Sequence, residues 1–124
     1  MTSVLNVDTI ADKAGTGPVA LTKQHAAKAW SNTEQASSYS TRDSFNLSSI
    51  SDGGTGKTGL TFTNAFSNAN HATTALASNL NNIAAHDTDT AVPTTTTIKL
   101  ASCNATDSLE DAAYLFSSTH GDLA

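Results

Sequence analysis

A pair of alternating segments around a glycine-rich turn constrains the fold of this chain most. Phe45 and Leu47 lie two positions apart before the turn, and Leu60 and Phe62 lie two positions apart after it. Because successive side chains of a strand point to opposite faces, this spacing places each pair on one face of its strand. The pattern predicts a half-buried antiparallel hairpin in which all four apolar side chains face the core.

The turn of this hairpin ends in the tripeptide Gly56-Lys57-Thr58, which is also the end of a phosphate-binding motif. That motif needs a further glycine five positions before Gly56, and Ser51 stands there instead. It also needs a helix after the lysine, whereas residues 59–63 have a strand-like sequence. We therefore interpret the segment as a structural turn with an exposed Lys57, and we expect no nucleotide or other cofactor.

The composition favours an all-β domain. Charged residues make up 14% of the 124 residues and hydrophobic residues 38%, so much of the remainder is Thr, Ser and Asn. Threonine suits the pleated surface of a strand, and serine and asparagine suit turns. Disorder is the alternative for a chain of this composition, but regular alternation of apolar residues disfavours it.

Further alternating segments occur along the chain, with turn residues between them. The expected strands cover residues 29–32, 39–50, 59–65, 72–78, 94–103 and 111–120. Residues 79–89 are polar and are expected to form an exposed loop. About six strands at this spacing predict a small antiparallel β-sandwich or jelly roll with an extended N-terminal arm.

The domain organisation predicted is an N-terminal docking arm and hinge at residues 1–24, followed by a β-sandwich domain at residues 25–124. Residues 22–30 fit either a short helix or an extended entry into the first strand. Residues 4–10 are apolar on both faces of an extended segment, which is typical of a strand added to another subunit. The candidate assembly-interface residues are Val4, Leu5, Val7, Ile10 and Trp30. Trp30 could alternatively stack on a sugar ring.

The sequence contains little evidence for a catalytic or metal-binding site. His86, Asp87 and Asp89 could hold a cation in a loop, but no glycine and glutamate follow at the spacing of a calcium loop. A solvated loop is the alternative. There is no Gly-x-Ser-x-Gly nucleophile elbow, and no pair of carboxylates falls on a recognisable strand face. We therefore expect a protein that is not an enzyme, with no catalytic, cofactor-binding or metal-binding residues.

Charge and cysteine content limit the partners. A net charge of −5, with six scattered Lys and Arg residues, disfavours binding to nucleic acid. We also expect no signal peptide and no membrane insertion, since no apolar run approaches about 20 residues. Cys103 is the single cysteine, so no intramolecular disulfide can form. A modest β-domain without disulfides favours association with itself as an additional source of buried surface.

Several pieces of the chain carry a family resemblance. They are AKAW at 27–30, RDSFNLSSI at 42–50, TFTNAF at 61–66, LNVDTI at 5–10 and HGDLA at 120–124. In these pieces the chain resembles the small tail-fibre-like virion proteins of marine bacteriophages. The similarity is most specific between residues 42 and 66 and is one of pattern only between residues 71 and 111.

The resemblance implies a structural component of the virion, assembled in the host cytoplasm. The expected function is that of a tail fibre component displayed on the particle for fibre assembly or host attachment. Its expected partners are two further copies in a homotrimer, other phage virion proteins bound through the N-terminal arm, and a host surface glycan. A head fibre or capsid decoration protein is the alternative, and a carbohydrate-processing enzyme is a third, less supported hypothesis.

Overall fold

The computed structural model describes residues 26–78, 82–87 and 92–124, and within them the protein is an antiparallel β-sandwich. The eight strands of the described residues are β1 (Ala29–Glu34), β2 (Ser40–Phe45), β3 (Leu47–Asp52), β4 (Lys57–Phe62), β5 (Ala72–Ala77), β6 (Ile83–His86), β7 (Thr97–Cys103) and β8 (Tyr114–His120). The all-β sandwich expected from the sequence is therefore confirmed. The expected number of strands, about six, is too low.

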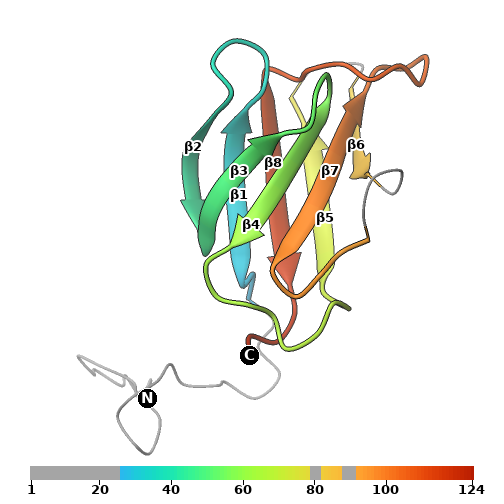
Figure 1. The fold of residues 1–124 in the computed structure, drawn as a ribbon. Coiled ribbons are helices and arrows are strands. Elements are labelled where there is room, and N and C mark those ends of the chain that lie inside the picture. The colour runs from blue at the N-terminus through green and yellow to red at the C-terminus, as the bar shows by residue number, and fades with distance from the viewer. Residues whose placement is uncertain (1–25, 79–81, 88–91) are drawn as a thin grey trace, which may run out of the picture.

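The strands form two packed sheets of four, ordered β2-β1-β8-β5 and β3-β4-β7-β6 (Figure 1). Two local features account for the extra strands. The expected strand at residues 39–50 is divided into β2 and β3, which belong to different sheets. The segment expected to be a loop contains β6, which pairs with β7 from Ile83↔Cys103 to His86↔Leu100.

The hairpin predicted from the sequence is present as β3 and β4. Its strands pair antiparallel from Leu47↔Phe62 to Asp52↔Thr58, with one register shift near Leu47. The connecting turn uses two glycines with positive φ, Gly54 at 95° and Gly56 at 71°. Other residues adopt these angles only with steric strain, so the glycine-rich sequence fits the turn it forms.

The apolar core lies between the two sheets and is supplied mainly by β4, β7 and β8. Leu60, Ile98, Leu100 and Leu115 are buried there, with small alanines filling the remaining positions. Three of the four hairpin residues behave as the alternation predicts, since Leu60 and Phe62 are buried and Leu47 packs against the core. Burying side chains of this size typically contributes about 1.5–3 kcal/mol each.

The prediction that Phe45 faces the core is wrong. Asn46 has a φ of 57°, in the left-handed region, and the chain turns there from one sheet into the other. Because of this turn, Phe45 and Leu47 belong to different strands, and the alternation that predicted one shared face for them does not continue across Asn46. Phe45 therefore ends β2 on the outer face of its sheet with 53% of its surface exposed.

Each end of the sandwich is closed by a different kind of contact. At one end Phe66 packs edge-on against Phe62, with ring centroids 4.9 Å apart. At the other end the buried Gln35 donates from Nε2 to Thr58 Oγ1 at 2.9 Å. The Gln35 Oε1 atom accepts from Ser102 Oγ at 3.0 Å and from the Ala112 amide at 3.0 Å. This polar cluster joins β1 to β4, β7 and the segment before β8.

The predicted arm, residues 1–24, lies outside the described residues, and so do Val4, Leu5, Val7 and Ile10. For residues 22–30, which fitted either a helix or a strand entry, Ala29 and Trp30 belong to strand β1. The described part of the chain contains no helix long and apolar enough to cross a membrane.

Candidate interaction surface

The sheet β2-β1-β8-β5 has hydroxyl side chains on its inner face, where apolar side chains are usual. Ser31 and Thr33 of β1 and Ser117 and Thr119 of β8 point inward and are buried. Most of these hydroxyls have partners: the Ser31 and Ser117 Oγ atoms share a hydrogen bond of 2.7 Å, and Thr119 Oγ1 shares one of 2.9 Å with Thr73 Oγ1. Pairing offsets the cost of burying polar groups, so the sheet tolerates this inner face.

The outer face of the same sheet carries the large apolar side chains. Cross-strand pairing brings them together from distant parts of the chain, since Trp30 pairs with Phe45 and Leu76 pairs with Phe116. The exposed fractions are 37% for Trp30, 53% for Phe45, 65% for Leu76 and 36% for Phe116. We call this set, together with Tyr114, the aromatic face. Contiguous exposed apolar residues on a small domain are typical of a binding surface.

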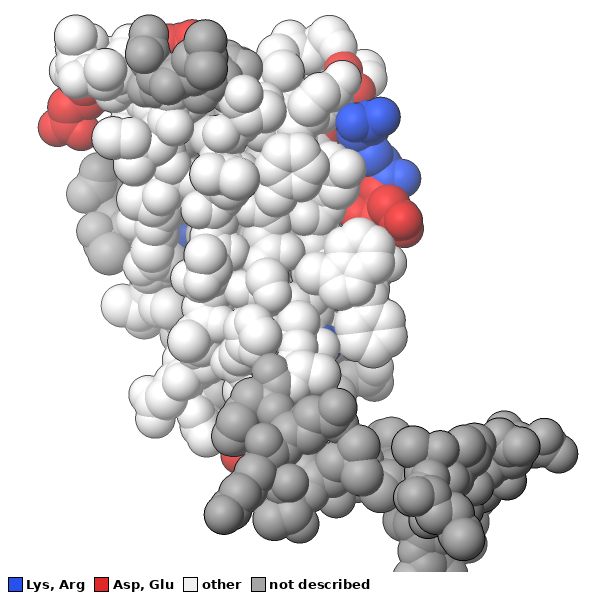
Figure 2. All heavy atoms as spheres, turned by 180° about the vertical axis from the view of Figure 1, so that it is seen from behind, with Lys and Arg blue, Asp and Glu red and all other residues white. Residues whose placement is uncertain are grey.

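Charge is confined to the margins of the aromatic face. Viewed from behind the orientation of Figure 1, this side of the molecule is almost entirely uncharged, with acidic and basic residues near its edges (Figure 2). Arg42 and Asp43 lie on the edge strand β2. The Arg42 guanidinium lies 4.4 Å from the centre of the Tyr114 ring, a cation–π contact that holds the charge at the rim.

Of the predicted interface residues, Trp30 lies on the aromatic face, and the other four lie outside the described residues. The sequence pattern did not identify Phe45, Leu76 or Phe116 as interface residues. A signal for Phe116 was present, because it alternates with Leu115 and Ser117 along β8, but alternation alone does not say which set faces outward.

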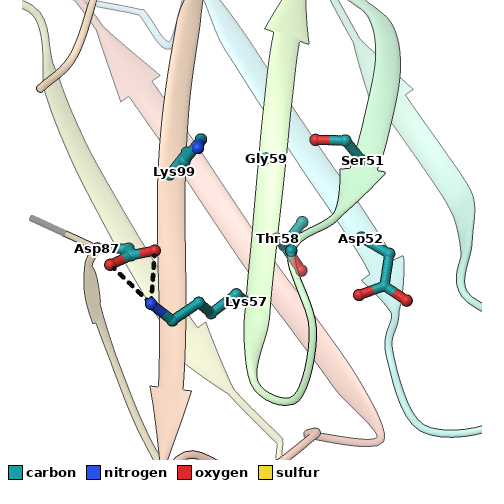
Figure 3. Close-up of a pocket in the computed structure, with 8 residues that line it drawn as sticks. Ser51, Asp52, Lys57, Thr58, Gly59, Asp87 and Lys99 are labelled. Atoms are coloured by element: carbon teal, nitrogen blue, oxygen red, sulfur yellow. Dashed lines mark hydrogen bonds and ion pairs between the residues drawn. The ribbon is translucent and has the colours of Figure 1, made fainter. Parts of the chain in front are cut away.

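A polar site lies on the other sheet, where side chains from β3, β4 and β7 and from the residue after β6 come together (Figure 3). It is a cavity of about 150 Å³ whose lining residues are Ser51, Asp52, Gly53, Lys57, Thr58, Gly59, Asp87 and Lys99. Lys57 Nζ lies 3.3 Å from Asp87 Oδ2 and 3.4 Å from Oδ1, and the dashed lines in Figure 3 mark these contacts. The charge of the lysine is therefore directed at a carboxylate of the protein.

This site corrects two expectations. Lys57 is not at an exposed turn: it begins β4, and its side chain is only 19% exposed. Asp87 is not in a solvated loop: it directly follows β6, and its side chain is 3% exposed. Asp89, the third residue of the suggested cation site, lies outside the described residues. Among the residues the structure describes, no three His, Cys, Asp or Glu side chains are grouped to hold a metal ion.

The hairpin turn beside this cavity uses its amides within the protein. Gly53 N donates to Lys57 O at 3.0 Å, and Lys57 N donates to Gly54 O at 2.9 Å. Gly54 N donates to Asp52 Oδ1, and Gly56 N donates to Asp111 Oδ1 at 2.6 Å. A phosphate-binding loop directs such amides at its ligand, so this turn has the hydrogen bonding of a hairpin instead.

Comparison of the chain with protein-family models, with curated proteins and with solved structures found no match in any of the three.

Proposed function

We propose that this protein is a structural component of a bacteriophage virion, a tail fibre component that assembles through its aromatic face. It acts by association and has no catalytic turnover. The localisation proposed is the virion, and the assembly proposed is a homotrimer that holds the domain on the particle for fibre assembly or host attachment.

One observation carries the proposal. Trp30, Phe45, Leu76 and Phe116 are exposed on one sheet, whose inner face combines buried serine and threonine with Leu115 and small alanines. Solvent exposure of large apolar side chains is unfavourable by about 25 cal/mol per Å², and covering them on association recovers this free energy. Aromatic residues are also enriched in protein interfaces, whereas charged residues are depleted at their centres.

The resemblance of residues 42–66 to tail-fibre-like virion proteins supports the same role from the sequence. These residues include the end of β2, the corner that joins it to β3, and the strands β3 and β4. The resemblance therefore includes the corner at which the chain passes from one sheet to the other.

The test is the position of the protein on phage particles that encode it. Antibodies raised against the described domain should label the fibres of purified virions in immunogold electron microscopy. Labelling of the head would support the alternative of a head fibre or capsid decoration protein. If purified virions contain no trace of the protein by mass spectrometry, the proposal of a virion component is wrong.

A further inference from the structure

The aromatic face needs a covering partner, and the size of the face limits which partner suffices. Strands are spaced about 4.8 Å apart and rise about 3.3 Å per residue, so a four-stranded sheet of six or seven residues per strand covers roughly 400 Å². Stable interfaces bury about 800 Å² on each partner. One such face supplies about half of this area, so each copy needs a second apolar surface besides its own face to form a stable assembly.

The sequence contains one other apolar cluster of the required kind. Residues 4–10 include Val4, Leu5, Val7 and Ile10, and Asp8 is the single charged side chain among the first ten residues. An apolar segment with one charge is complementary to a face whose own charges stay at the rim. The β1 strand begins at Ala29, next to Trp30, so the chain enters the sandwich beside the face itself.

We propose that residues 4–10 of one copy lie across the aromatic face of a neighbouring copy. This inference rests on the assembly role proposed above and names the segment that fills the face. Residues 11–25 can span at most about 50 Å when fully extended, which is ample for reaching an adjacent subunit. Each copy then gives one segment and receives one, a head-to-tail contact that forms a ring such as a trimer when the rotation between copies closes.

Cross-linking of full-length chains tests the contact directly. In a Cys103→Ser background, chains with Ile10→Cys are mixed with size-tagged chains carrying Leu76→Cys and treated with a short bismaleimide. The expected product is a covalent heterodimer. The matched control replaces Leu76→Cys with Ser49→Cys, an exposed position on β3 in the other sheet, and should give little product. Equal yields for the two pairs, or no heterodimer, would overturn the inference.

Charge substitutions separate this inference from the proposed assembly itself. Ile10→Asp and Leu76→Asp, each in the full-length chain, should both weaken association by about tenfold or more. The double variant should be weakened by less than the product of the two single effects, because both substitutions remove the same contact. If Leu76→Asp dissociates the assembly and Ile10→Asp does not, another partner covers the face and only the arm contact is wrong. If the wild-type chain is monomeric, the arm contact and the assembly proposal both fail.

Discussion

The Asn46 side-chain oxygen accepts a 2.7 Å hydrogen bond from the backbone amide of Asn64, across the corner where the chain passes from one sheet to the other. On its other side the Asn46 Nδ2 atom donates to Lys28 O at 3.0 Å, next to the start of β1. One side chain thus joins β1, the β2–β3 corner and the end of β4. Asparagine tolerates the positive φ of this corner better than most residues, so one residue can both form the turn and make these hydrogen bonds.

Asn46→Ala should lower the free energy of unfolding by about 2–4 kcal/mol, from lost hydrogen bonds and the strain of a positive φ on alanine. Asn46→Gly removes the same hydrogen bonds without that strain, so it should cost about 1 kcal/mol less than Asn46→Ala. Urea denaturation of the three proteins measures both differences. Equal costs for the two variants would contradict the role of backbone strain, and a negligible cost for both would contradict the corner as a whole.

Phe62→Ala should destabilise the protein by about 3–5 kcal/mol, because it opens a cavity where Phe62 packs against Phe66 in the core. Phe45→Ala is the matched control on the exposed face and should cost less than about 1 kcal/mol in the isolated subunit. The denaturation midpoints of the two variants give the comparison. Similar midpoints would mean that the division of the two phenylalanines between core and surface is wrong.

Lys57→Ala should lower the free energy of unfolding by about 1–3 kcal/mol, because it removes a charged partner from the nearly buried Asp87 carboxylate. Asp87→Asn combined with Lys57→Ala should cost less than the two single changes added together, since the second change no longer breaks the pair. Thermal or urea unfolding of the wild type, the two single variants and the double variant measures these costs in a double-mutant cycle. A cost below about 0.5 kcal/mol for Lys57→Ala would instead indicate a solvent-screened pair with little net effect.

Burial raises the pKa of Tyr39, and the nearby Asp52 and Asp111 charges raise it further, while a hydrogen bond with Thr58 lowers it. The unfolded chain therefore loses this proton at lower pH than the folded protein. The contribution of Tyr39 to stability is fully present below a pH of about 10 and declines as the pH rises above it.

Tyr39→Phe removes the titrating group together with the 2.6 Å hydrogen bond from Tyr39 Oη to Ser51 O. The variant should be less stable than the wild type by about 0.5–1.5 kcal/mol at neutral pH. This difference should shrink above pH 10, where only the wild type loses the Tyr39 contribution. Urea denaturation at neutral pH and at several pH values above 10 measures it. A difference that stays constant or grows would contradict the raised pKa.

Local alternation in the sequence was sufficient to predict the β3–β4 hairpin and the strand β7. Leu60 and Phe62 in β4, and Ile98 and Leu100 in β7, are large apolar residues separated by polar or small ones, so their face was evident. The strand β6 was missed because its sequence, Ile-Ala-Ala-His, is short and does not alternate clearly.

The other sheet could not be oriented from the sequence, because many of its inner positions are occupied by serine and threonine. Ser31 and Ser117 satisfy each other only through the pairing of β1 with β8, residues that lie 86 positions apart. The aromatic face depends on the same long-range pairing. Trp30 was identified alone as an interface residue. The other members of the face became visible only when the register placed Phe45 beside Trp30, and Leu76 beside Phe116 on the same sheet.

Assembly through the aromatic face is tested most directly by light scattering, which measures the mass in solution of the full-length protein and of a variant substituted on that face. The wild type should have about three times the 12.7 kDa mass of one chain, and a variant with Leu76→Ser and Phe116→Ser should be a folded monomer. Leu109→Ser, at an exposed leucine away from the face, is the control and should keep the wild-type mass. A monomeric wild type, or a double variant that assembles as the wild type does, would contradict assembly through the aromatic face.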